Sequence, residues 1–414
     1  MDVAARIELI RELCSFEGRL AGTDAERRAA GRLAERLRAS GRRAEVEPTY
    51  VHPQFGLVHA LHCALGVAGS LVAIAAPALG FGLVLVAATS MYLDLNYRLY
   101  LVRRLFFRRA SQNVVSAGAR SGLPARLVLT AHYDVARTGA VFAPKRARRS
   151  ARMSERYAWF GPFRLLFWSL ALLLPPIGAR MAGIESDALA AAQLPQTLIL
   201  LVGAFALVDI ELSDVVPGAN DNASGVATAL ALAAALDADP PEHLDVWVVL
   251  PGAEECLQEG MRSFVRGHRE KLEDRPSYFV NLDTVGHGTV RFQTAGGWVV
   301  TYAMDRRLVE LASAIAEADA DGPARYGARA MARGLAGDEM PPRIAGMPSI
   351  SIACTDEDGY VPGYHLPSDT PEAVDAAALE RAHGFALELV RQLDRDVGRR
   401  EPRGNSAERE PAAA

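Results

Sequence analysis

The feature that most constrains this chain is a long stretch without charged side chains. From Gln54 to Leu93 there is no Asp, Glu, Lys or Arg. The segment Pro77-Ala78-Leu79-Gly80 interrupts this stretch near its middle, which predicts two apolar helices joined by a tight turn, Leu57–Ala76 and Leu79–Leu93. A helix needs about 20 apolar residues to cross a bilayer core, with about 17 tolerated. The pair is therefore a candidate transmembrane hairpin.

A second apolar pair follows later in the chain. Its helices are expected at Leu165–Ala179 and Leu194–Val208, separated by a short segment that contains Arg180, Glu185 and Asp187. By this reading only the first of the four helices reaches the length of a bilayer span, and the other three are short. Two transmembrane hairpins that pack together as a four-helix anchor are our first interpretation. A buried helical subdomain, or an oligomer interface, is the alternative.

Basic residues gather at one end of both hairpins. They are Arg98, Arg103, Arg104, Arg108 and Arg109 after the first hairpin, and Lys145, Arg146, Arg148, Arg149, Arg152 and Arg156 before the second. Cytoplasmic loops of membrane proteins are enriched in Lys and Arg, so we expect these loops and both termini in the cytoplasm. A face that is solvated or binds anionic lipids is the alternative explanation, and it predicts the same side.

Charge and cysteine content exclude two classes of protein. The formal net charge is −4 and the two signs are mixed along the chain, which leaves no basic field for nucleic acid. The four cysteines show no C-x-x-C spacing, which argues against a disulfide framework and against a thiolate zinc site. They fit a reducing compartment. Residues 1–20 carry charges throughout, so we expect no secretory signal there.

Outside the hairpins, strand patterns alternate with helix patterns. Short runs rich in apolar residues predict strands at Arg43–Tyr50, Ala125–Thr130, Leu244–Leu250, Tyr278–Leu282 and Ser349–Ala353. Helical spacing predicts helices at Asp24–Ser40, Gly225–Leu236 and Ala376–Leu393. Asn222 or Ser224 is the expected cap of the second of these helices. This alternation predicts an α/β fold, with a mixed, mostly parallel central sheet flanked by helices and four apolar helices inserted into it.

Five segments at the ends of expected strands, or in the loops after them, carry imidazole and carboxylate groups. They are AHYD with His132 and Asp134, GANDNASG with Asp221, PGAEE with Glu254 and Glu255, NLDTVG with Asp283, and GYHLPSDT with His365. Ligands of open α/β sheets bind at the carboxyl ends of the strands. Imidazole and carboxylate without thiolate suit Zn²⁺ at a hydrolytic site. Each segment alone is a weak signal, but the five in this order are a strong one.

These segments resemble the M28-like zinc peptidase family of bacterial leucine aminopeptidases and glutamate carboxypeptidase II. The resemblance covers residues 1–50 and about 110–395 apart from the hairpins, and it includes the opening Arg19-Leu20-Ala21-Gly22-Thr23. It implies the zinc exopeptidase fold and the hydrolysis of peptide substrates, most similar to an aminopeptidase. It also implies two zinc ions per chain.

The resemblance further implies a role for each site residue. The metal ligands would be His132, Asp221 as the bridge between both ions, Glu255, Asp283 and His365. Glu254 would be the general base, and Asp134 would orient the ring of His132. Asp369 is expected to support His365. Tyr360 or Tyr364 is a candidate to stabilise the oxyanion, although packing explains a tyrosine there equally well.

The expected domain organisation follows from the hairpins. The peptidase domain comprises residues 1–53, 96–157 with the basic loops, and 210–396; the hairpins are residues 54–95 and 158–209; residues 397–414 form a disordered tail. We therefore expect a multi-pass protein of the inner (cytoplasmic) membrane, with the lipid bilayer as a partner and the catalytic domain in the cytoplasm. A homo-oligomer is compatible with the sequence.

Two features leave other functions open. The family's usual Ser-Asp-His segment before the last strand is Gly337-Asp338-Glu339 here, which leaves the substrate pocket undefined. Glutaminyl cyclases resemble the same family and use a single zinc held by Asp, Glu and His, so a cyclase-like acyltransferase is an alternative. An inactive membrane scaffold of the same fold is another, but such proteins normally lose ligands and none is missing here.

Overall fold

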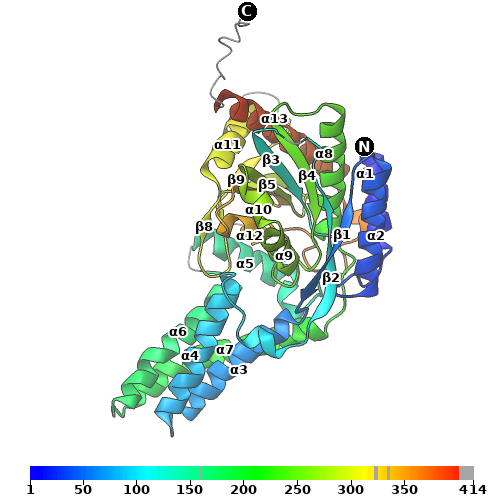
Figure 1. The fold of residues 1–414 in the computed structure, drawn as a ribbon. Coiled ribbons are helices and arrows are strands. Elements are labelled where there is room, and N and C mark those ends of the chain that lie inside the picture. Colours follow the sequence, from blue (N-terminus) through cyan, green and yellow to red (C-terminus); the bar gives the residue numbers. More distant parts are fainter. Residues whose placement is uncertain (121, 158–159, 321–324, 333–335, 401–414) are drawn as a thin grey trace, which may run out of the picture.

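The structure is a computed structural model that describes residues 1–120, 122–157, 160–320, 325–332 and 336–400. An α/β domain forms the larger part, and a narrow bundle of four helices projects from it (Figure 1). Both hairpins therefore leave the same domain and run side by side. This arrangement confirms the expected fold class.

One mixed eight-stranded sheet lies at the centre of the α/β domain, in the order β1-β2-β4-β3-β5-β10-β6-β9. Its strands are β1 (Glu45–Val51), β2 (Arg109–Ser116), β3 (Ala125–Thr130), β4 (Leu244–Leu250), β5 (Ser277–Leu282), β6 (Thr289–Gln293), β9 (Arg329–Met331) and β10 (Ser349–Thr355). The neighbours β4, β3, β5 and β10 are parallel, so their carboxyl ends meet at one edge. A two-stranded ribbon, β7 (Ala295–Gly296) and β8 (Tyr302–Ala303), lies outside this sheet.

Helices cover both faces of the sheet. One face packs against α1 (Val3–Cys14), α2 (Asp24–Ala39), α8 (Gly225–Ala238), α11 (Arg306–Ala320) and α13 (Ala376–Arg400), and the other against α9 (Glu259–Gly267) and α10 (Arg269–Glu273). Side chains alternate between the faces along each strand: Leu127 and Leu129 enter the first core and Val128 the second. Two further helices are α5 (Pro144–Arg156) and α12 (Met340–Ile344).

The Asn222 amide caps α8 as expected, because its Oδ1 accepts a hydrogen bond from Gly225 N at 3.0 Å. The expected disordered tail from Val397 is wrong for its first residues. Val397 is buried in the core and Arg400 lies beside Asp396, so α13 continues to Arg400. The rest of that tail, residues 401–414, lies outside the described residues.

The projecting bundle consists of α3 (Phe55–Val72), α4 (Pro77–Leu95), α6 (Pro162–Met181) and α7 (Asp187–Leu212). Each hairpin packs on the other, with α3 against α7 and α4 against α6. Close approach is possible because glycines line the helix contacts: a Cβ on Gly80 would lie 2.5 Å from the Gly69 oxygen. The expected four-helix packing is therefore present in the structure.

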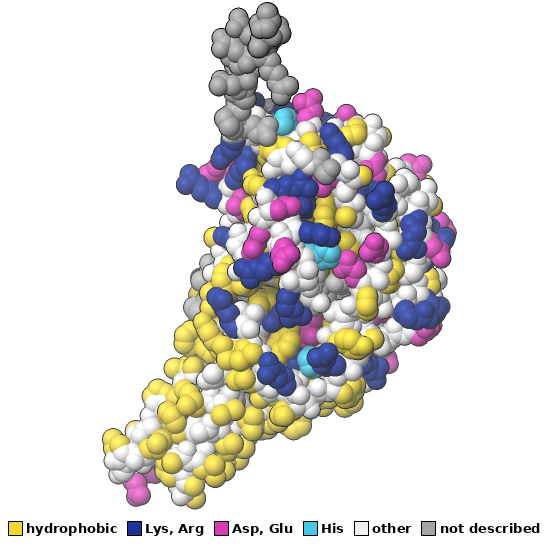
Figure 2. Space-filling view, in the orientation of Figure 1, with side chains coloured by type: hydrophobic (Ala, Val, Ile, Leu, Met, Phe, Trp, Pro, Cys, Tyr) yellow, Lys and Arg dark blue, Asp and Glu magenta, His cyan; other side chains and the backbone are white. Residues whose placement is uncertain are grey.

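All four bundle helices are long and apolar enough to cross a membrane, with 18 to 26 residues and mean hydropathies of 1.4 to 1.8. Their outward side chains are largely apolar, and hydrophobic atoms dominate the surface of the projecting arm (Figure 2). The expectation that three of the helices are short was wrong. α7 extends beyond Leu194–Val208 at both ends, because charged residues such as Asp187 and Glu211 limit the apolar span but not the helix.

A buried arginine connects the bundle to the α/β domain. Arg103 Nε lies 2.9 Å from Asp94 Oδ2 near the end of α4, and Arg103 Nη1 lies 2.8 Å from Glu259 Oε1 at the start of α9. Its side chain is fully buried. The alternative of a solvated or lipid-binding face is therefore wrong for Arg103, because two buried carboxylates hold it in the interior.

Replacing this arginine is expected to destabilise the whole protein. Arg103→Leu leaves Asp94 as an unpaired buried charge and Glu259 with His52 as its remaining partner, so we expect a loss of about 3–5 kcal/mol in the free energy of unfolding. Arg104→Leu is the matched control, because the neighbouring Arg104 is exposed. Thermal unfolding of the detergent-purified variants measures the difference. Equal unfolding midpoints for the two variants would contradict the prediction.

Candidate metal centre

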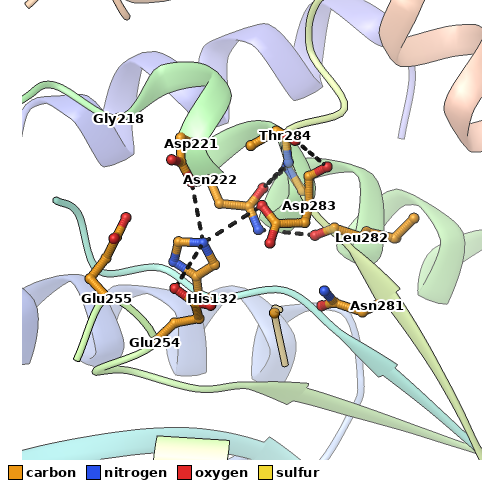
Figure 3. A network of polar contacts seen from close by, with 12 residues as sticks. His132, Gly218, Asp221, Asn222, Glu254, Glu255, Asn281, Leu282, Asp283 and Thr284 are labelled. Atoms are coloured by element: carbon orange, nitrogen blue, oxygen red, sulfur yellow. Dashed lines mark hydrogen bonds and ion pairs between the residues drawn. The ribbon is translucent and has the colours of Figure 1, made fainter. Parts of the chain in front are cut away.

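Predicted site residues converge at the carboxyl edge of the parallel strands, and Figure 3 shows His132, Asp221, Glu254, Glu255 and Asp283 there. His132 follows β3, Glu254 and Glu255 follow β4, and Asp283 follows β5. Asp221 lies in the turn Ala219–Ser224 that precedes α8, and His365 lies in the loop between β10 and α13. Side chains separated by more than two hundred positions in sequence thus face one another.

Asp221 lies between the two imidazoles. Its Oδ1 is 3.3 Å from His132 Nε2, and its Oδ2 is 3.3 Å from His365 Nε2. His365 Nε2 is also 3.3 Å from Glu255 Oε2, and His132 Nε2 is 3.7 Å from Asp283 Oδ1. The side chains therefore form three three-residue groups: His132 with Asp221 and Asp283, His365 with Asp221 and Glu255, and His132 with Glu254 and Glu255. In each group the candidate ligand atoms lie within 4.8 Å of one another.

The donor set fits divalent cations. Three carboxylate oxygens of the site, Asp221 Oδ2, Glu255 Oε1 and Asp283 Oδ1, are buried without a hydrogen bond in the part of the chain that the structure describes. Burying such charges without compensation costs free energy. Carboxyl groups also outnumber imidazoles here, so the site has a net negative charge that cations would neutralise. Imidazole and carboxylate are the ligands that zinc accepts in hydrolytic enzymes.

The proton affinities of the two histidines reflect the same charge excess. Burial disfavours a charged imidazole, but the Glu255 and Asp221 carboxylates outweigh it and raise the pKa of His365 to about 10. His132 behaves alike: burial opposes the charge, and Glu254 with other carboxylates raises its pKa well above the usual range. When no cation is bound, protons on the histidines offset the negative charge of this cluster. Binding of a metal ion must therefore release these protons.

Asp134 lies behind His132 and fixes the loop that carries the glutamates. Its Oδ1 is 3.4 Å from His132 Nδ1, the geometry expected of a carboxylate that orients the ring. The same side chain accepts hydrogen bonds from the backbone N–H groups of Glu254, at 3.1 Å, and Glu255, at 3.2 Å. One carboxylate therefore positions two strand ends relative to each other.

Glu254 lies beside His132 at the outer limit of an ion pair. Its Oε2 is 4.0 Å from His132 Nε2, and its Oε1 accepts a hydrogen bond from Gln258 Nε2 at 2.5 Å. Burial raises the pKa of Glu254 well above its usual value. A carboxylate held there can take a proton from a group bound between the histidines.

The tyrosines and Asp369 differ in how they relate to the site. The ring of Tyr364 stacks on His365 with centroids 3.9 Å apart, whereas Tyr360 lies under the guanidinium of Arg148. Asp369 accepts hydrogen bonds from the backbone N–H groups of Asn220 and Asp221, so it supports the bridging loop, and the expectation that it supports His365 was wrong. The loop before α8 turns these two N–H groups toward the Asp369 carboxylate.

Several functional groups were not assigned from the sequence. Arg19, fully buried, donates to the carbonyls of Tyr133, Pro217 and Gly218 and so ties two ligand loops together. Asp338 is fully buried with neither oxygen hydrogen-bonded within the described residues, and burial raises its pKa well above the usual value. The motif Gly337-Asp338-Glu339 marked this position, but only the fold places it near His132 and Asp283.

Glu26 of α2 gives the protein a pH-dependent stability. Burial, followed by the nearby Asp134 carboxylate, raises the pKa of Glu26 to about 8. The folded state binds this proton more tightly than the unfolded chain, whose pKa is about 4.3. The resulting stability is complete below about pH 4 and is lost as the pH rises to about 8.

Glu26→Gln is expected to remove this pH dependence. The free energy of unfolding of the variant minus that of the wild type should rise by up to about 1.4 kcal/mol for each pH unit between about pH 5 and 8. Thermal unfolding midpoints of both proteins across that range provide the measurement. A difference between the two that does not change with pH would refute the assignment.

Comparisons with known proteins agree with this geometry. Residues 202–390 match the model of peptidase family M28. A search of curated proteins found no match. Among solved structures, a zinc aminopeptidase from Bacillus subtilis shares 15% identity with a TM-score of 0.56, and the alignment covers 95% of each chain.

Two further structures have the same fold. A leucine aminopeptidase precursor from Bacteroides thetaiotaomicron has 16% identity and a TM-score of 0.52, over 94% of this chain and 97% of the other. A glutaminyl cyclase from Porphyromonas gingivalis has 13% identity and a TM-score of 0.54, over 95% and 99%. Identities this low establish the fold alone. The chain thus has the fold of zinc aminopeptidases and glutaminyl cyclases, and its residues 202–390 are similar to peptidase family M28.

Proposed function

We propose that the protein is a membrane-anchored exopeptidase of the aminopeptidase type that uses two zinc ions and Glu254 as general base. The observation that carries this proposal is the position of Asp221, whose two oxygens each face a different imidazole at 3.3 Å. A site for one ion has no need of a carboxylate shared in this way. A carboxylate that faces both ligand groups suits a pair of ions that act together.

The residues have distinct tasks in this proposal. His132 and Asp283 would hold one ion, His365 and Glu255 the other, and Asp221 both. Two ions held there would supply Lewis acidity toward the scissile carbonyl and the attacking water. Glu254 accepts the proton of that water at Oε2 and returns it to the leaving amine. Tyr364, stacked on His365, is better placed than Tyr360 to donate to the oxyanion.

The test uses the full chain purified in detergent. We expect about two zinc ions per chain, hydrolysis of peptides with a free amino terminus in preference to blocked ones, loss of activity on chelation and recovery with zinc. A single tightly held zinc, with cyclisation of amino-terminal glutamine in place of hydrolysis, would identify a cyclase. A chain without metal or hydrolysis would be an inactive scaffold. Either outcome would overturn the proposal.

We further propose that the bundle spans the inner membrane and that the α/β domain lies in the cytoplasm. Support comes from the four apolar helices and from the basic residues around their domain-side ends. Protease added to sealed inverted membrane vesicles should digest the α/β domain. Protection of that domain in inverted vesicles, with digestion in spheroplasts, would show the opposite orientation.

A further inference from the structure

The side chain of Gln258 contacts the proposed base and is buried. Gln258 is 1% exposed and immediately precedes α9. Its Nε2 donates to Glu254 Oε1 at 2.5 Å and to the Ala336 carbonyl at 3.0 Å, which uses both hydrogens of the amide. Its own backbone N–H donates to the Glu254 carbonyl at 2.7 Å. The glutamine thus holds both the backbone and one carboxylate oxygen of Glu254.

Two donors fix the orientation of that amide. Gln258 Oε1 accepts from the Tyr97 hydroxyl at 2.6 Å and from Trp298 Nε1 at 3.3 Å, while Trp298 Nε1 also lies 3.0 Å from the Tyr97 hydroxyl. A flipped amide would bring its NH₂ against the indole N–H and its oxygen against the carboxylate of Glu254. Burial raises the pKa of Tyr97 well above the usual value, so the group remains a phenol that can donate.

The phenol and the indole are both placed by the bundle. Tyr97 follows the end of α4 at Leu95 and has a left-handed backbone, with a φ of 60°. The preceding Asn96 accepts a hydrogen bond from Val300 N at 3.2 Å, which joins this corner to the loop that carries Trp298. The Trp298 ring meets Phe163 of α6 edge-on, with centroids 5.3 Å apart. The ends of α4 and α6 thus determine where the Tyr97 hydroxyl and the Trp298 indole N–H lie.

We propose that Gln258 and Tyr97 are positioning residues for Glu254, through which the bundle sets the orientation of the base. This inference rests on the proposed role of Glu254. The hydrogen bond to Oε1 leaves Oε2 as the oxygen that faces His132. Without it the carboxylate turns freely, and a misplacement of about 1 Å in a catalytic group costs about 100-fold in rate.

The test compares Gln258→Met, Tyr97→Phe and the double variant in the full chain. We expect kcat to fall ~10- to 100-fold in Gln258→Met and less in Tyr97→Phe, with KM and zinc content unchanged. Gln258→Met also leaves the buried partners of the amide without a hydrogen bond, so its thermal midpoint should fall. The phenol acts only through the amide, so the double variant should be no slower than Gln258→Met. Tyr92→Phe, at a half-exposed position of α4, is the control and should keep the wild-type kcat.

A structural readout complements the kinetics. In a crystal structure of metal-free Gln258→Met, the Glu254 carboxylate should have left its place 4.0 Å from His132 Nε2. Wild-type kcat in both single variants, additive losses in the double variant, or an unmoved carboxylate would each overturn the inference. Should Gln258→Met fail to fold, Tyr97→Phe alone decides. Activity that survives Glu254→Gln would instead sink the proposed function itself.

Discussion

Glu254→Gln is expected to lower kcat by about 100- to 10,000-fold while the zinc content stays at the wild-type level. The amide keeps the volume of the side chain and can still hydrogen-bond to Gln258, but it cannot accept a proton from water. The metal groups of His132 with Asp283 and of His365 with Glu255 share no atom with Glu254, so metal binding should persist. Steady-state kinetics and metal analysis of the same preparation provide the measurement.

The matched control for this substitution is Glu310→Gln. Glu310 pairs with Arg306 on the exposed side of α11, so the same chemical change there should leave kcat unaltered. Wild-type activity in Glu254→Gln would exclude this residue as the base. Loss of zinc from the variant would instead assign Glu254 to the metal shell, as its inclusion in the group of His132 and Glu255 allows.

Asp221→Asn is expected to abolish the paired site. The amide offers one oxygen and one NH₂ group, and the NH₂ cannot bind a cation, so at most one ion keeps this ligand. We expect the zinc content to fall to one per chain or below and kcat to fall at least ~100-fold, since both ions act on the same water in the proposed mechanism. Metal analysis after dialysis against a weak chelator measures the first effect.

Two comparisons make the outcome specific. Asp239→Asn, at an exposed position paired with Arg391, should retain both ions. Without the shared carboxylate, the two imidazoles also lose a partner at 3.3 Å each, which lowers their proton affinity in the metal-free protein. Retention of two ions by Asp221→Asn would show that the carboxylate is not the bridge.

The strands that the sequence predicted best are those buried on both faces. β3 and β4 begin and end where the largely apolar runs Ala125–Thr130 and Leu244–Leu250 do, because a strand covered on both sides is apolar at most positions. β6 and β9 were not predicted. They are short strands near the sheet edge with mixed side chains, as in Thr289–Gln293, and only pairing with β10 and with each other defines them.

The candidate site divides in a similar way. His132, Asp221, Glu255, Asp283 and His365 were recognisable because each lies in a short motif at a strand end or before a helix. Gln258 and Tyr97 were not, since their hydrogen bond joins positions 161 residues apart and no local pattern records it. Arg103 was misread for the opposite reason: its neighbours in sequence are basic, but its partners in space are acidic.

The hairpins enter the α/β domain through internal loops, so the chain crosses between bundle and domain at four points. The bundle therefore cannot be removed by truncating the chain at one end. Excising both hairpins to obtain a soluble enzyme would remove Asp94 from Arg103 and separate Tyr97 from the helix end that holds it. A truncated protein would need a redesigned junction, with new partners for the arginine and for Gln258, before its kinetics describe the native enzyme.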